Sequence, residues 1–246
     1  MKERAITIPL EKGGAEIIRS LTNVDGPIRS EKAGATDASD AARLWLHVTR
    51  AGEERAIYFE QSQNGARVDK ESVPGELVQA IRKAAWPEFW TEQLETRLAY
   101  EWESPELDPK ASYQELGTSL AIDPGAASAA FAEAGLLQQI SAYTKALEGV
   151  GYRRLRTWIQ RGPRDQVFLT GYQLVVDIEH AFYAWREAAV PVDKWVRNTL
   201  RSMSNEDAEL WENLLAVEPI AAWAATGVLP LTVSESPDGQ SILVGR

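Results

Sequence analysis

The spacing of apolar residues changes at Pro74, and this change limits the folds open to the chain. Before Pro74, residues 44–48 alternate in character and residues 56–60 form a second apolar run across a short turn. Alternation predicts half-buried strands joined in a hairpin. After Pro74, apolar side chains recur every three or four residues, as in 77–85, and this spacing predicts helices. Strands followed by helices indicate the α+β class.

The same patterns predict two domains. Two prolines and their polar neighbours interrupt both patterns at residues 104–109, so we expect an α+β domain over residues 1–104 and a mainly helical domain over residues 105–246. We expect a helix at 90–102 and a terminal hairpin at 231–244 that returns to the amino-terminal sheet. No internal repeat is visible. The predicted fold is therefore α+β: a small amino-terminal β-hairpin or sheet with helices, a mainly α-helical region and a terminal hairpin.

Composition excludes several classes of protein. The 246 residues include no cysteine, which removes disulfides, thiolate nucleophiles and cysteine-based metal sites. His47 and His180 are too far apart to form a metal-binding pair on one helix, so we expect neither a metal site nor a cofactor. A net charge of −10 disfavours non-specific binding to nucleic acid or to anionic membranes. Without a secretory signal or a run of about 18 apolar residues, we expect a cytoplasmic protein without membrane contact.

Residues 112–135 have the pattern of two short helices joined by a tight turn. Ser112 and Glu115 form a capping box for a helix over 112–120, and Asp123 can cap a second helix that starts at Pro124 and stops at Gly135. The segment resembles the helix-turn-helix of bacterial regulators and of the promoter-reading domain of sigma factors, in which Glu-Leu-Ala and Pro-Gly are common at these places. The resemblance implies a DNA-binding transcriptional regulator.

The second of these helices lacks the side chains that read DNA. Residues 124–134 contain no Lys, Arg, Asn or Gln, whereas base readout and phosphate contact need them. The segment is therefore interpreted as an alanine-rich packing helix. A degenerate helix-turn-helix that contacts protein is the alternative.

Positive charge gathers in one segment, residues 149–164, which holds five arginines and no acid. Two aromatic residues lie among the arginines, a combination suited to phosphate contact and base stacking on single-stranded nucleic acid. The alternative is a solvated helix face paired with acidic segments such as 88–108 or with a partner. The predicted binding residues are Tyr152, Arg153, Arg154, Arg156, Trp158, Arg161 and Arg164.

A second candidate site lies on a helix expected over residues 166–189. At helical spacing, Glu179 falls on one face among apolar residues, with Arg186 two turns away on the same face. A carboxylate in such surroundings is tuned for proton transfer or belongs to a buried ion pair, and the sequence leaves both open. The residues of this possible buried polar site are Tyr172, Glu179, Tyr183 and Arg186.

Motifs of common enzymes are missing: the chain has no Gly-x-Ser-x-Gly elbow, no Walker loop and no His-Glu-x-x-His helix. We therefore favour a non-catalytic subunit or adaptor of a protein or protein–nucleic-acid assembly, which contacts nucleic-acid backbone or an acidic partner through the arginine and aromatic residues. The expected partners are other protein subunits and RNA or single-stranded DNA. One alternative is a small-molecule enzyme or sensor built around Glu179 and Arg186, and another is a helix-turn-helix transcriptional regulator.

Overall fold

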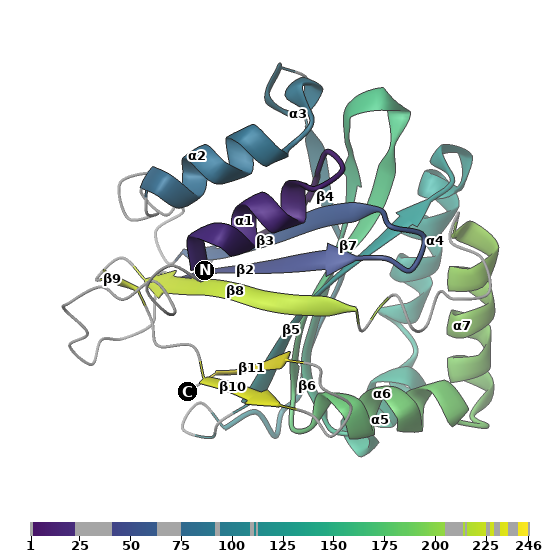
Figure 1. Cartoon of the computed structure of the whole chain (residues 1–246). Coiled ribbons are helices and arrows are strands. Elements are labelled where there is room, and N and C mark those ends of the chain that lie inside the picture. The colour runs from purple at the N-terminus through teal and green to yellow at the C-terminus, as the bar shows by residue number, and fades with distance from the viewer. Residues whose placement is uncertain are drawn as a thin grey trace.

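Two antiparallel β-sheets face each other in the computed structural model, and helices cover their outer faces (Figure 1). The structure describes residues 2–22, 41–62, 75–91, 94–108, 111, 113–204, 214, 216–224, 227–228, 232–235 and 241–245.

The first sheet has the strand order β1-β3-β2-β8-β9. Its strands are β1 (Lys2–Pro9), β2 (Ala41–Val48), β3 (Glu54–Ser62), β8 (Val217–Ala224) and β9 (Gly227–Val228). Helices α1 (Gly14–Thr22) and α2 (Gly75–Ala84) lie on its outer face, followed by the short helix α3 (Pro87–Thr91). The strands expected near residues 44–48 and 56–60 correspond to β2 and β3, and the helix expected over 77–85 corresponds to α2.

The second sheet has the strand order β10-β11-β5-β7-β6-β4. Its strands are β4 (Glu95–Glu103), β5 (Tyr113–Ile122), β6 (Tyr152–Arg161), β7 (Val167–Val175), β10 (Thr232–Glu235) and β11 (Ser241–Gly245). Its outer face carries α4 (Ala127–Leu137), α5 (Ser141–Gly149), α6 (Ile178–Glu187) and α7 (Pro191–Met203) (Figure 1). Two single 3₁₀ turns, η1 (Pro124–Ala126) and η2 (Pro163–Asp165), precede α4 and β7.

The order of elements repeats within the chain. From β1 to β4 and again from β5 to β8, the chain runs strand, helix, strand, strand, helix, strand, which is the ferredoxin-like arrangement. The last strand of each half crosses to the other half: β4 pairs with β6, and β8 pairs with β2. The two halves share the order and the burial of their elements but not their residue identities, so the repeat cannot be seen in the sequence.

Successive side chains of a strand point to opposite faces of the sheet. The core therefore has one layer between the two sheets and one layer between each sheet and its helices. On β1, Ala5 and Thr7 face the second sheet, whereas Ile6 and Ile8 face α1 and α2. The sheets approach closely at Gly117 of β5, where a Cβ atom would lie 2.5 Å from the Trp45 ring. Glycine at this position therefore makes room for the indole.

The predicted fold class is wrong in its second part. The region 105–246 is not mainly helical, because it contributes β5, β6, β7, β8 and the terminal hairpin. The helices expected over 90–102 and 112–120 are replaced largely by β4 and β5, and the helix expected over 166–189 is replaced by β7 followed by α6. These predictions used apolar residues three or four apart, and residues four apart lie on one face of a strand as well as of a helix. Ser112 itself lies outside the described residues.

The terminal hairpin is present but returns to a different sheet. β10 pairs with β11, and β11 pairs with β5 of the second sheet, not with the amino-terminal sheet. The boundary expected at residues 104 and 105 falls between β4 and β5, and both exchanged strands reach across it. The division into two domains stays a prediction. Among the described helices, none has the length and apolar character needed to cross a bilayer.

Candidate functional site

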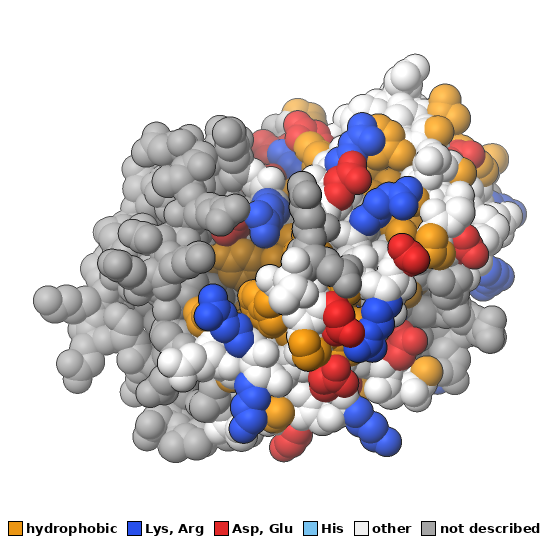
Figure 2. Space-filling view, turned by 90° about the horizontal axis from the view of Figure 1, so that it is seen from above, with side chains coloured by type: hydrophobic (Ala, Val, Ile, Leu, Met, Phe, Trp, Pro, Cys, Tyr) orange, Lys and Arg blue, Asp and Glu red, His pale blue; other side chains and the backbone are white. Residues whose placement is uncertain are grey.

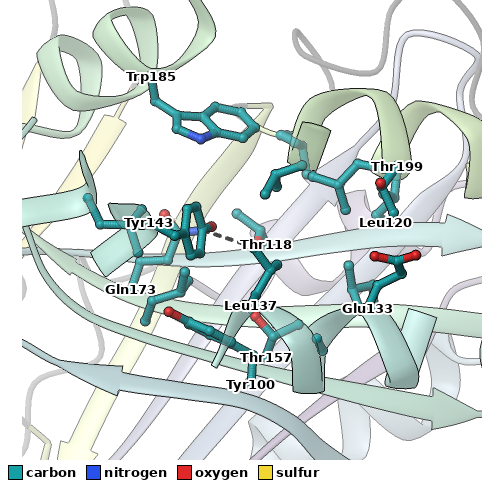
Figure 3. A pocket seen from close by; sticks show the side chains of 18 of the residues that line it. Tyr100, Thr118, Leu120, Glu133, Leu137, Tyr143, Thr157, Gln173, Trp185 and Thr199 are labelled. Atoms are coloured by element: carbon teal, nitrogen blue, oxygen red, sulfur yellow. Dashed lines mark hydrogen bonds between the residues drawn. The ribbon is translucent and has the colours of Figure 1, made fainter. Parts of the chain in front are cut away.

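A cavity of about 160 Å³ lies between the outer face of the second sheet and helices α4 to α7 (Figure 3). The sheet forms its floor and the helices form its roof. Most of the lining is apolar, with aliphatic and aromatic side chains from every one of these helices. An apolar cavity of roughly 150 Å³ is large enough to take up benzene. The space therefore suits a molecule about the size of a single ring.

The hydroxyl-bearing residues of the floor form a row that crosses four strands. Tyr100 of β4 is in register with Thr157 of β6, Thr157 with Gly171 of β7, and Gly171 with Thr118 of β5. All four residues line the cavity. Neighbouring strands lie about 4.8 Å apart, so this row runs across the whole floor. We call Tyr100, Thr157 and Thr118 the hydroxyl row.

Gly171 shapes the floor between the two threonines. A Cβ atom at this position would overlap the hydroxyl oxygen of Thr118, so a larger residue would displace that hydroxyl. The side-chain amide of Gln173, two residues further along β7, lies 3.5 Å from the same oxygen. The absence of a side chain at Gly171 therefore allows the Thr118 hydroxyl to lean over the middle of the floor.

The roof combines a second tyrosine with apolar and indole groups. Tyr143 and Leu147 of α5 are buried, as are Phe182 and Trp185 of α6. The rings of Tyr143 and Tyr100 meet edge to face with centroids 5.8 Å apart. Figure 3 shows Tyr143 reaching in from one side and Trp185 lying above the floor. The roof therefore places aromatic surface against any molecule held on the floor.

Helix α4 enters the roof through its small residues. Ala130 is buried and lines the cavity, whereas its neighbour Ala129 is exposed. Glu133 lies one turn after Ala129 and lines the cavity too, with its buried Oε2 atom making no hydrogen bond. The alanine-rich segment therefore packs against the core along one side only.

Burial keeps the cavity phenols protonated. Burial raises the pKa of Tyr100, and it raises the pKa of Tyr143 well above its ordinary value, with smaller contributions from Tyr100, Tyr152 and Asp193 nearby. The Tyr100 hydroxyl is buried and makes no hydrogen bond within the described structure. At neutral pH these groups can therefore donate a hydrogen bond to a bound molecule, but they cannot serve as phenolate bases.

The corresponding layer of the first half is filled by close packing. A Cβ atom at Gly14 of α1 would lie 2.9 Å from the carbonyl oxygen of Ala84 in α2, so the two helices approach each other closely. Ile18, Leu77 and Leu44 fill the space between these helices and the sheet and are almost fully buried. The two halves thus share a fold, but the helices of the first half pack closely on their sheet whereas those of the second half leave a cavity.

The basic segment is a strand, and its arginines are paired within the chain. Arg156 donates to Glu3 of β1 at 2.9 Å, and Arg154 donates to Glu103 of β4 at 2.8 Å and lies 3.5 Å from Glu3. Both guanidinium groups and Glu3 are largely buried between the sheets. These two arginines therefore join the first half to the second and present no free positive surface.

The other predicted contact residues do not form a joint surface. Tyr152 is buried and lines the cavity, and Trp158 is buried against Phe59 with ring centroids 6.1 Å apart. Arg153 lies 3.6 Å from Glu106, and Arg164 lies 2.9 Å from Glu88 and 4.0 Å above the Trp86 ring. Arg161 is exposed at the end of β6. Figure 2 shows acidic and basic side chains interspersed on the face that it presents.

The adaptor prediction is therefore wrong. A nucleic-acid-binding patch needs unpaired arginines and exposed aromatic rings, whereas this segment supplies buried rings and arginines that are mostly paired. Pairing of the arginines with acidic segments is the alternative that the sequence left open. Alternation along β6, which sends successive residues to opposite faces, is what separates the members of the cluster.

The residues expected around Glu179 do not form one buried site. Tyr172 belongs to β7 and faces the first sheet, where its ring stacks on Phe59 with centroids 3.8 Å apart. Glu179 and Arg186 lie on α6, which begins only after Asp177 accepts a hydrogen bond from the backbone of His180. The single helix assumed for all these residues is in fact a strand, a turn and a helix.

Tyr183 and Arg186 lie at the outer surface of α6. Tyr183 is 41% exposed, and the Arg186 guanidinium lies 4.8 Å above its ring. Neither residue lines the cavity, which α6 reaches through Phe182 and Trp185 instead.

The helix-turn-helix interpretation is also wrong. Its first helix is β5, a buried strand of the second sheet. Asp123 does act as a cap, since its side chain accepts from the Gly125 amide at 2.6 Å, but it starts a 3₁₀ turn that leads into α4. A strand followed by a helix cannot place two helices against DNA.

No cluster of three or more His, Asp and Glu side chains that could hold a metal ion occurs among the described residues. Sequence reasoning did not single out Tyr100, Thr118, Thr157 or Tyr143. In the sequence, each of them appears only as a residue with a hydroxyl group inside a strand or helix, and such residues are common. What brings them together is strand register.

Three solved structures resemble the chain over 94% of its length. A protein described as anthrone oxidase-like has 12% sequence identity, a TM-score of 0.43 and 92% of its own length covered. A candidate monooxygenase from Fusobacterium nucleatum has 10% identity, a TM-score of 0.39 and 97% covered. A candidate monooxygenase from Lactobacillus acidophilus has 13% identity, a TM-score of 0.39 and 100% covered. No family model and no curated protein matches the sequence.

Proposed function

We propose that the protein binds a small, mainly apolar molecule of about one ring in the cavity beneath α4 to α7, as a small-molecule enzyme or sensor does. The observation that carries the proposal is the cavity itself, an apolar space of about 160 Å³ with a few converging hydroxyl groups. Binding sites for small molecules combine an apolar lining with a few polar groups that orient the ligand. This site replaces Glu179 and Arg186 as the centre of the small-molecule hypothesis.

The proposal is supported by the contrast between the two halves. In the first half, the helices pack closely on each other and on the sheet, with Gly14 of α1 against Ala84 of α2. An unfilled cavity lowers stability in proportion to its volume. A ligand that occupied the cavity of the second half would recover that loss.

Binding of small aromatic probes tests the proposal. Benzene, toluene and indole should each raise the midpoint of thermal unfolding, because a ligand that binds only the folded state stabilises it by about 2.7 kcal/mol at a hundred times its dissociation constant. Ala130→Leu should abolish the shift by filling the cavity from α4. Ala129→Leu is the matched control, since residue 129 is exposed on the same helix and the shift should persist.

Two results would overturn the proposal. One is the absence of any thermal shift with all three probes. The other is a shift that persists in Ala130→Leu as it does in Ala129→Leu, which would place binding elsewhere. The cytoplasmic location and the contact with other protein subunits expected from the sequence stay predictions.

A further inference from the structure

The three residues of the hydroxyl row lie along one line across the cavity floor. Tyr100, Thr157 and Thr118 follow one line across the sheet, while the side chains above and below that line on β5 are Leu116 and Leu120. A molecule lying on this floor therefore meets hydroxyl groups along one line, with leucines on both sides of that line on β5 and the Gln173 amide beside it on β7. This pattern suits a ring with an oxygen at its edge better than a plain hydrocarbon.

Tyr100 is the member of the row whose buried hydroxyl oxygen lacks a hydrogen-bond partner among the described residues. Its side chain is 4% exposed, and its hydroxyl makes no hydrogen bond within the described structure. Buried hydroxyl groups normally have a hydrogen-bond partner, because an unsatisfied one keeps the full penalty of its desolvation. The Tyr143 ring packs edge to face against the Tyr100 ring and so holds it in place. Tyr100 lines a cavity that can hold a ring, and its contact with Tyr143 holds the orphan hydroxyl in place.

Gly171 controls how close a ligand comes to the row. It lies between Thr157 and Thr118 in register, and a methyl group at this position would overlap the Thr118 hydroxyl oxygen. The middle of the floor is thus the lowest point available to a ring. Any side chain added there would raise the floor and push the Thr118 hydroxyl aside.

We propose that the ligand carries a hydroxyl or carbonyl oxygen at the edge of its ring, that this oxygen accepts a hydrogen bond from the Tyr100 hydroxyl, and that Gly171 sets the depth at which the ring lies. This inference rests on the proposed function, since it requires the cavity to bind a ligand. It adds the chemical class of the ligand and two residues that determine specificity.

A pair of probes of similar size separates the polar contact from cavity filling. Phenol and toluene differ by a hydroxyl in place of a methyl group. Tyr100→Phe should weaken the binding of phenol by about tenfold, the loss expected for one hydrogen bond, and should leave the binding of toluene unchanged. Tyr183→Phe is the matched control, because Tyr183 is exposed on α6 and does not line the cavity. Calorimetric or NMR titration measures the affinities of both probes for the wild type and the two variants.

The outcomes separate this inference from the proposed function. If neither phenol nor toluene binds the wild-type protein, the proposed function fails and the inference fails with it. If both bind and Tyr100→Phe weakens them equally or not at all, the cavity binds ligands but the Tyr100 contact is refuted.

A second set of variants tests the depth of the floor. Gly171→Ala should weaken both probes, whereas Gly171→Ala combined with Thr118→Ala should restore toluene binding, because the double variant removes the oxygen that the new methyl group meets. Gly149→Ala is the control, since a Cβ atom at Gly149 has nothing within 4 Å. Circular dichroism checks that each variant folds. Toluene binding that Gly171→Ala leaves unchanged would refute the role of Gly171.

Discussion

The side-chain amide of Gln160 pairs with the backbone of Thr7 as a neighbouring strand would. Its oxygen accepts from the Thr7 amide at 2.7 Å, and its nitrogen donates to the Thr7 carbonyl oxygen at 2.7 Å. Both residues are fully buried. Strand β1 is an edge of the first sheet, so a side chain of the second sheet satisfies backbone groups that would otherwise be unpaired.

Replacing this amide should therefore destabilise the whole fold. Gln160→Met keeps the length of the side chain but removes both hydrogen bonds, and the two buried Thr7 groups left behind should cost about 2–5 kcal/mol. Gln139→Met is the control, because Gln139 is exposed and should change stability by at most about 0.5 kcal/mol. Urea unfolding measures both. Equal stability of the two variants would show that Gln160 does not tie the sheets together.

The close approach of the sheets at Trp45 gives a second prediction. Gly117→Ala should lower the free energy of unfolding by about 1–3 kcal/mol through overpacking, because the new methyl group would lie 2.5 Å from the indole ring. Gly135→Ala in α4 should instead raise it by about 0.5–1 kcal/mol, since open space surrounds that position. Thermal and urea unfolding of the two variants should therefore shift in opposite directions. A shift in the same direction would contradict the packing described at Trp45.

The buried arginines give a third prediction. Arg156→Met should cost about 3 kcal/mol, at the lower end for breaking a buried ion pair, because Arg154 still lies 3.5 Å from Glu3. Arg161→Met, at an exposed position of the same strand, should change stability by about 0.5 kcal/mol or less. Urea unfolding again measures the difference. If both variants keep wild-type stability but lose affinity for single-stranded nucleic acid, the internal pairing is not the role of these arginines.

Stability should fall steeply in alkaline solution. The pKa of each of Tyr58, Tyr100, Tyr143, Tyr152 and Tyr172 is raised in the folded protein, in every case mainly by burial. Their folded-state pKa values exceed the unfolded ones, so their contribution to stability is complete below about pH 10 and is lost as the pH rises further.

Unfolding free energies and phenolate absorbance, measured together from neutral to alkaline pH, check this expectation. Phenolate formation by these residues should coincide with unfolding. The double variant Tyr100→Phe/Tyr143→Phe should lose less stability per unit of pH above pH 10, because two of the five buried phenols are gone. Ionisation of five phenols in the still-folded protein would contradict it.

Local patterns in the sequence determined the first part of the fold. Alternating residues in β2, an apolar run in β3 and apolar residues in α2 at helical spacing predicted those elements. Helix α2 shows its period directly because one of its sides faces solvent, whereas β2 is buried on both faces and is marked by its residue types and by the turn that follows it. The cap at Asp123 was also predictable, because its hydrogen bond joins residues only two positions apart in the sequence. Composition alone excluded cysteine chemistry.

Tertiary structure decided the second sheet and the cavity. β5 is buried on both faces, so its apolar residues lose the alternation that marks a strand, and Leu116 and Leu120 then fit a helix equally well. The cavity depends on register between Tyr100, Thr157 and Gly171, residues far apart in the chain. A shift of one residue in any of these strands would turn its side chains to the opposite face. That register is set by packing between distant segments, and no local pattern in the sequence records it.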